Sequence, residues 1–182
     1  IGAFAEHPRY QGSGSSLVNP TRVTTALDAL RGRGVDVAYV AAYAPQDPDV
    51  APDLAGAVAA AREADVAVVM AGLPEIAESE GFDRATLALP ASHDALVAAV
   101  AAANPRTVVA LSQGAPVLLP WAADVAAILE SYLGGQAGGG ALVDVLYGDV
   151  NPGGRLAETF PASQDDVAAD PFPVLGMDAV VF

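Results

Sequence analysis

Short, continuously apolar runs alternate along this chain with segments whose apolar residues recur at helical spacing. The expected strands are 1–4, 36–42, 65–72, 107–111, 125–129 and 156–160, and the expected helices are 21–31, 53–64, 91–103 and 139–147. Strands that are apolar throughout are typical of a parallel sheet that helices cover on both faces. The sequence therefore predicts an α/β fold, a three-layer sandwich with a mostly parallel sheet of about six strands.

The length and the course of this pattern indicate one domain. The chain has 182 residues, of which 53% are apolar, and this is enough for one substantial core. The pattern runs over residues 1–161, and an acidic, proline-containing tail follows at 162–182. Because the sequence opens on IGAF, without Met and partway into an expected strand, we interpret it as a piece of a longer protein.

Charge and composition exclude several classes of function. The 22 acidic residues outnumber eight basic ones, all of them Arg, and the net charge of −14 would repel phosphate backbones, so we predict no nucleic-acid partner. The longest apolar runs have about eight residues, against roughly 20 for a membrane span, so we predict no membrane association. The chain has no Cys and only two scattered His, which predicts no metal site.

A polar, acidic loop at 75–90 separates the expected strand at 65–72 from the Ala-rich helix at 91–103. Loops of about 15 residues are usually functional or disordered, and open α/β sheets place their chemistry just past the carboxyl ends of strands. Glu78, Glu80 and Asp83 lie within six residues in this loop, and Arg84 follows. We therefore expect the function here, although a solvated turn with surface ion pairs is the plain alternative.

A Gly- and Ser-rich loop, QGSGSS at 11–16, precedes the first expected helix. A dinucleotide fingerprint would need a third Gly where Leu17 stands, and a P-loop would need a Lys, which this chain lacks. The loop is better suited to a sugar-binding rim, and the alternative is an ordinary turn.

Three further side chains invite a catalytic interpretation that we do not favour. Ser92, His93 and Asp94 are adjacent, but adjacency does not make a triad, and no nucleophile elbow is present. We expect Ser92 to be a helix N-cap and Asp94 to be favoured in the first helical turn. Trp121 has the chemistry of a sugar-stacking platform, but we expect it to pack between sheet and helix.

Six segments carry a resemblance to a known family. They are RYQGSGSS at 9–16, ESEGFDR at 78–84, LALP at 87–90, NPRTVVAL at 104–111, GAPVLLPW at 114–121 and GGQAGGGALVDVLYGDVNPGGRLAETFP at 134–161. In this order they resemble the C-terminal α/β sandwich domain of family 3 glycoside hydrolases, the β-glucosidase and β-xylosidase family. The resemblance covers residues 1–161, and its last block is the most specific.

The resemblance implies one domain of a retaining exo-hydrolase, with β-glucosidase as the favoured activity. The general acid/base of such enzymes is the Glu before the Gly of an EGYDR-like motif, which is Glu80 here, with Glu78 as the second candidate. We expect partial burial between domains to raise the pKa of Glu80. Asp83 and Arg84 would orient the loop, with Arg84 positioning Asp83.

The resemblance also implies partners for the site. An N-terminal (β/α)8-type barrel domain of the same enzyme would supply an Asp nucleophile, and the substrate would be a β-linked glucoside or xyloside. Arg9, Gln11 and Ser13 are expected to line the rim of the pocket, and no cofactor is expected. A homo-oligomer is compatible with the sequence.

Two alternatives from other classes remain open. One is a non-catalytic carbohydrate-binding or scaffolding module that shapes the site of a partner domain. The other is a flavodoxin-like nucleotide or flavin binder, which the missing fingerprint and the net charge of −14 disfavour.

Overall fold

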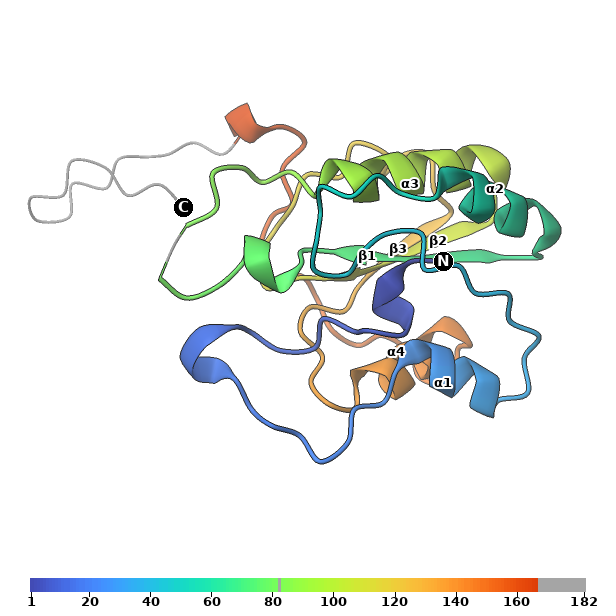
Figure 1. Cartoon of the computed structure of the whole chain (residues 1–182), viewed down its shortest axis with the longest axis horizontal. Coiled ribbons are helices and arrows are strands. Elements are labelled where there is room, and N and C mark those ends of the chain that lie inside the picture. Colours follow the sequence, from blue (N-terminus) through green and yellow to red (C-terminus); the bar gives the residue numbers. More distant parts are fainter. Residues whose placement is uncertain (82, 167–182) are drawn as a thin grey trace, which may run out of the picture.

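A computed structural model describes residues 1–81 and 83–166 of the chain. A parallel sheet forms the middle layer, with strands β1 (Ala67–Gly72), β2 (Thr107–Ser112) and β3 (Ala127–Glu130) in the order β1-β2-β3. Figure 1 shows α2 (Leu54–Glu63) and α3 (Ala91–Ala103) over one face, and α1 (Ala26–Gly32) and α4 (Gly138–Leu146) over the other. The predicted α/β architecture with helices on both faces is confirmed.

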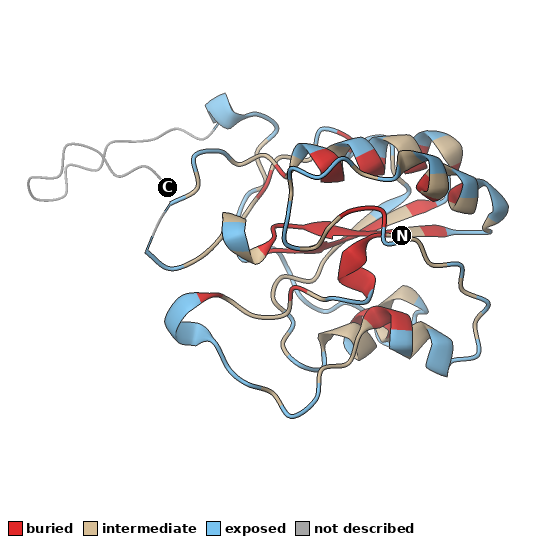
Figure 2. Ribbon diagram, in the orientation of Figure 1, coloured by how far each residue is buried: buried red, intermediate tan, exposed pale blue. Residues whose placement is uncertain are grey.

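The two longer strands are buried on both of their faces. Val69 and Met70 in β1, and Val109 and Ala110 in β2, are all buried, although adjacent side chains along a strand point to opposite faces of the sheet. The buried colour of Figure 2 accordingly follows the strands and the side of α3 that faces them. The continuous apolar runs of the sequence therefore reflect packing against a helical layer on each side.

The prediction of about six strands is wrong, because the described residues form three. Residue 1 does continue the sheet, since the Ile1 carbonyl accepts the Met70 N–H at 2.8 Å. The chain then turns at Gly2 into a 3₁₀ turn, Ala3–Ala5, which buries Phe4. Residues 36–42 reach this segment by one backbone bond, from Gly2 N–H to Val40 O at 2.9 Å.

The last expected strand, at 156–160, is also wrong. No backbone hydrogen bond of the described residues pairs this segment with β1, β2 or β3, and Leu156 is 56% exposed. The segments 156–160 and 36–42 both have the apolar composition of a strand. A strand also needs a neighbouring backbone in register, which composition does not supply.

All four predicted helices are present, but the start of the first and the capping residue of the third differ from the prediction. The first begins at Ala26 rather than at residue 21, because the Thr25 side chain caps it by accepting the Asp28 N–H at 3.0 Å. The third begins at Ala91 after Pro90, so the expected Ser92 cap is wrong. The Ser92 hydroxyl instead donates to the Pro48 carbonyl at 3.1 Å.

The lower helical layer depends on a close backbone approach. A Cβ added to Gly139 at the start of α4 would lie 2.3 Å from the Thr24 carbonyl oxygen and 2.6 Å from the Ala26 nitrogen. Only glycine lets α4 pack so closely against the start of α1. This explains one glycine of the run at 138–140 by packing rather than by ligand binding.

No helix among residues 1–81 and 83–166 is long and apolar enough to cross a membrane.

The end of the domain at residue 161 stays a prediction. Most of the expected tail, 167–182, lies outside the described residues, while Gln164 accepts the Leu87 N–H at 2.9 Å and so touches the acidic loop.

Asn104 offers a test of how the upper layer is held. Its buried amide donates to the carbonyls of Ala61 and Ala64 at 2.9 and 3.0 Å, and its oxygen accepts the Arg106 N–H at 2.8 Å. We expect Asn104→Ala to lower the free energy of unfolding by about 2–3 kcal/mol, because buried polar groups lose their partners. Urea denaturation of the 182-residue chain measures this.

The matched control is Asn151→Ala, at an exposed position after α4. It should change the free energy of unfolding by less than about 0.5 kcal/mol. Equal effects of the two substitutions would show that the Asn104 bonds do not hold α2 to the end of α3.

Candidate functional site

The acidic loop lies at the carboxyl edge of the sheet, as the sequence predicts. It leaves β1 at Leu73, forms a 3₁₀ turn at Glu75–Ala77 and reaches α3 at Pro90. The Gly- and Ser-rich loop before α1 meets it, and so does the start of the loop after β2. Three loops that are far apart in sequence therefore converge where a parallel sheet usually holds its ligands.

Glu80 is exposed, and its carboxylate is held by a single residue of the Gly- and Ser-rich loop. The Ser15 N–H donates to Oε2 at 2.6 Å and the Ser15 hydroxyl donates to Oε1 at 2.7 Å. These two bonds lower the pKa of Glu80, the hydroxyl first, because they stabilise the ionised form. The pKa of Glu80 is thus lowered in this domain, and the rise expected from burial between two domains stays a prediction.

Glu78 is in a different environment, although it lies only two positions before Glu80. Its two carboxylate oxygens accept the Gly114 N–H at 3.0 and 2.8 Å. The Arg9 guanidinium lies 3.7 Å from Oε2 and donates to the Glu78 carbonyl at 3.1 Å. The Arg9 and Glu78 side chains are only 5% and 18% exposed, so this ion pair is largely removed from water.

Two of the three expected rim residues, Arg9 and Gln11, have side-chain partners in the described chain. Arg9 supports Glu78, and Gln11 closes its own loop by donating to the Val18 carbonyl at 3.1 Å and accepting the Val18 N–H at 3.0 Å. Ser13 is buried, and its hydroxyl has no partner among the described residues. Contact of Arg9, Gln11 and Ser13 with a substrate stays a prediction.

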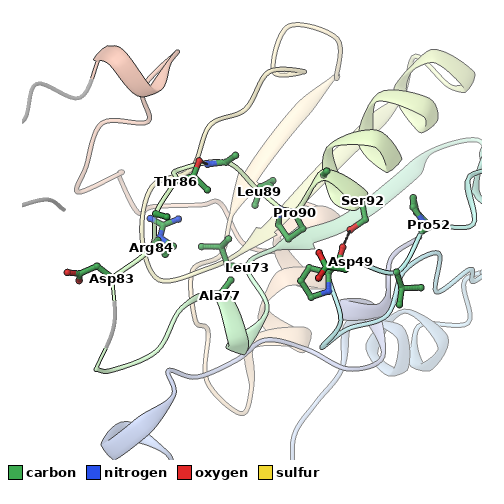
Figure 3. A pocket seen from close by; sticks show the side chains of 16 residues that line it. Asp49, Pro52, Leu73, Ala77, Asp83, Arg84, Thr86, Leu89, Pro90 and Ser92 are labelled. Atoms are coloured by element: carbon green, nitrogen blue, oxygen red, sulfur yellow. Dashed lines mark hydrogen bonds between the residues drawn. The ribbon is translucent and has the colours of Figure 1, made fainter.

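Asp83 and Arg84 line an open pocket of about 670 Å³ between the acidic loop and residues 48–52. Figure 3 shows the Asp83 carboxylate pointing away from Arg84, and none of the ion pairs among the described residues joins them. The Arg84 guanidinium instead donates to the Pro116 carbonyl at 3.0 Å. Arg84 thus ties the acidic loop to the loop after β2, and the expected pairing with Asp83 is wrong.

The residues of the rejected triad are parts of the core. His93 is 2% exposed, lies among the rings of Phe4 and Tyr43, and accepts the Gly72 N–H at 3.3 Å. Burial lowers the pKa of His93 to about 4, so it is neutral at ordinary pH. Asp94 accepts the Trp121 indole N–H at 2.8 Å, and Trp121 is 3% exposed, which confirms the core packing expected of it.

One carboxyl of this edge was missed by the sequence analysis. Glu130 ends β3, where it accepts the Gln113 amide N–H at 2.5 Å and the Tyr132 N–H at 2.7 Å. Burial raises the pKa of Glu130 to about 7, and the charge of Glu78 adds to the rise. Because Glu130 lies at the end of an apolar run, only its position at the carboxyl end of a strand could have pointed to it.

Ser15 was also missed, although it belongs to the QGSGSS loop that the sequence analysis singled out. Nothing in the sequence separates Ser15 from Ser13 and Ser16, and only the folded loops bring it against Glu80. Within residues 1–81 and 83–166, no three His, Asp or Glu side chains are grouped so that they would hold a metal ion.

A family model described as the glycosyl hydrolase family 3 C-terminal domain matches residues 1–178. The chain is 48% identical over 165 residues to thermostable β-glucosidase B of Acetivibrio thermocellus, covering 88% of this chain and 22% of the relative. It is 47% identical over 171 residues to an exo-α-(1→6)-L-arabinopyranosidase of Bifidobacterium longum, covering 91% and 22%. The chain therefore spans about a fifth of the length of these relatives.

Solved structures agree with this match. The crystal structure of a family 3 β-glucosidase of Bifidobacterium adolescentis is similar to the chain with a TM-score of 0.85 at 47% identity, over 94% of this chain and 26% of that one. A β-glucosidase of Chaetomium thermophilum is similar with a TM-score of 0.74 at 29% identity, over 88% and 20%.

Glu130 generates a test of the electrostatics of this edge. Below pH 4.5 both the folded and the unfolded chain hold its proton, and the free energy of unfolding has its full value. Between pH 4.5 and about 7 the unfolded chain ionises first, so the free energy of unfolding falls as the pH rises. We expect the wild type to lose about 1–2 kcal/mol relative to Glu130→Gln between pH 5 and pH 8, allowing for solvent screening.

Urea denaturation of both chains at the two pH values measures this difference. Gln fits position 130 as a neutral substitute, because the Gln113 carbonyl oxygen has no partner among the described residues and can accept its amide. Glu63→Gln, on the exposed side of α2, is the control for the loss of one acidic charge. Parallel pH profiles for the wild type and Glu130→Gln would contradict the raised pKa.

Proposed function

The chain belongs to the C-terminal domain family of glycosyl hydrolase family 3, and on that premise we propose that Glu80 is the general acid/base of a retaining exo-acting β-glycosidase. The domain supplies this Glu to an active site that it shares with an N-terminal (β/α)8-type barrel domain of the same enzyme. That barrel supplies the Asp nucleophile. The favoured activity is that of a β-glucosidase, acting on a β-linked glucoside or xyloside.

The observation that carries the proposal is the contrast between the two glutamates of the loop. Glu78 has both oxygens on the Gly114 N–H and lies against Arg9, so it acts as a structural anion. Glu80 is exposed at the carboxyl edge of the sheet, and Ser15 holds its carboxylate from one side. A carboxylate has about four lone-pair sites, so Glu80 retains sites for proton transfer to a second partner.

The reaction proceeds in two steps. In the first, protonated Glu80 donates its proton to the glycosidic oxygen while the barrel Asp attacks the anomeric carbon, and the aglycone leaves as an alcohol. In the second, the Glu80 carboxylate takes a proton from water as the water oxygen bonds to the anomeric carbon. The bond to the Asp breaks, and its electron pair returns to that carboxylate.

The pKa of Glu80 has to change between these steps. The Ser15 bonds hold the pKa of Glu80 low in the domain, which suits the base of the second step. In the first step the ionised Asp of the barrel and the exclusion of water by the sugar both raise it. Once the Asp is glycosylated its charge is gone, and the pKa of Glu80 falls again.

We propose that the barrel, rather than this domain, selects the sugar. The chain is almost equally similar to a β-glucosidase and to an L-arabinopyranosidase, at 48% and 47% identity. Overall identity to this domain thus does not distinguish relatives named for different sugars. We therefore assign sugar selection to the barrel, and the linkage chemistry to this domain.

A non-catalytic scaffolding module is the second candidate, favoured by the structural partners of Glu78, Arg9 and Gln11. In that case the Ser15–Glu80 contact would serve only to join two loops. The flavodoxin-like alternative is set aside, because the chain belongs to a hydrolase family.

The deciding experiment compares Glu80→Gly with the wild type in the full-length enzyme. The substrates are p-nitrophenyl β-glucoside and β-xyloside, whose leaving group needs little protonation. We expect kcat to fall about 10²–10⁴-fold, because water loses its general base in the second step. Azide needs no base, so it should restore turnover and yield a glycosyl azide.

Glu75→Gly, in the same loop, is the matched control and should keep near-normal kcat. Glu78→Gly should lose activity through loop disorder, without azide rescue. A Glu80→Gly enzyme with near-normal rates would refute the assignment and favour the scaffolding module. Azide rescue in Glu78→Gly alone would move the role to Glu78.

A further inference from the structure

We propose that Ser15 is the positioning residue of Glu80, an inference that rests on the proposed function of that carboxylate. Ser15 holds both oxygens at once, with its N–H on Oε2 at 2.6 Å and its hydroxyl on Oε1 at 2.7 Å. One hydrogen bond would leave the carboxylate free to rotate about it. Two bonds from one residue fix the plane of the carboxylate, which is the orientation that proton transfer needs.

The turn that carries Ser15 is shaped around Glu80. Gly14 begins the 3₁₀ turn Gly14–Ser16 with φ at 84°, in the region that favours glycine. A Cβ added at Gly14 would lie 2.6 Å from Oε2 and 2.8 Å from the Cβ of Glu80. Glycine at position 14 is therefore required both by the backbone and by the space that the Glu80 side chain occupies.

The turn is anchored away from Glu80 by two other contacts. Gln11 joins its side-chain amide to both backbone groups of Val18, which closes the base of the loop. Arg9 precedes the loop and is tied to the carbonyl of Glu78 at 3.1 Å. The loop before α1 and the acidic loop are thus fixed to one another beside the Ser15–Glu80 contact. The backbone that carries Ser15 is therefore restricted independently of Glu80.

The chemistry of Ser15 matches both states of Glu80. Its N–H and hydroxyl donate to the ionised carboxylate, which favours the base of the second step. A serine hydroxyl can also accept a hydrogen bond, so it remains a partner when Oε1 carries the proton. Ser15 itself touches neither the sugar nor the water in this assignment, and it acts through Glu80 alone.

The test is Ser15→Ala in the full-length enzyme, with p-nitrophenyl β-glucoside as the substrate. We expect kcat to fall about tenfold, part of the general-base contribution. The alkaline limb of the kcat/KM profile should move to higher pH, because the acid form of Glu80 gains stability when a donor to the ionised form is lost. Azide should restore most of the lost turnover, which it would not do for a merely disordered loop.

Three further variants make the result specific. Ser15→Thr retains the hydroxyl and should restore kcat and the pH profile. Ser16→Ala is the matched control, because the Ser16 hydroxyl donates to the Ser13 carbonyl rather than to Glu80, and it should behave as the wild type. Gly14→Ala places a methyl group where the carboxylate lies and should lower kcat at least as far as Ser15→Ala.

The outcomes separate this inference from the proposed function. If Glu80→Gly loses activity and regains it with azide while Ser15→Ala matches the wild type in kcat and pH profile, Ser15 does not position Glu80. A loss in Ser15→Ala that azide leaves uncorrected, or that Ser16→Ala reproduces, also overturns it, because the role is then general loop stability. Near-normal rates in Glu80→Gly overturn the proposed function itself.

Discussion

The Glu78 carboxylate accepts the Gly114 N–H and lies against the Arg9 guanidinium, so three loops meet at a side chain that is only 18% exposed. The segment before α1, the loop after β1 and the loop after β2 each contribute one partner to this junction. Breaking it would leave Arg9 charged, with 5% of its side chain exposed and its Nε already without a partner among the described residues. Such an uncompensated buried charge is costly, so the three loops are expected to separate together rather than one at a time.

Neighbouring glutamates consequently do different work at this edge. The largely buried Glu78 fixes the backbone of the acidic loop, and this places the exposed Glu80 against the turn at Gly14–Ser16. Glu130 adds a third carboxyl, whose pKa burial raises to about 7 at the end of β3. One sheet edge therefore holds three carboxyl groups: Glu78 paired with Arg9, Glu80 facing solvent, and Glu130 with a pKa of about 7. Their environments alone distinguish them.

Much of this arrangement follows from the sequence, and the failures have identifiable causes. Apolar runs located β1, β2 and β3, and helical spacing located all four helices, because burial on a layered sheet leaves a strong pattern. The segments at 36–42 and 156–160 have strand composition, but no neighbouring backbone in register. At the site, the acidic loop was found from its place after a strand. Ser15 was not, because three serines in one loop are equivalent until another loop lies against one of them.

Trp121, buried beside α3 with its indole N–H on Asp94, is the single tryptophan of the chain. Its intrinsic fluorescence is thus a built-in optical probe of one layer. Emission from a dry indole lies at shorter wavelength than emission from a wet one, so detachment of α3 from the core would shift the spectrum to the red. A spectroscopist can follow that layer in the 182-residue chain without a dye or an introduced label.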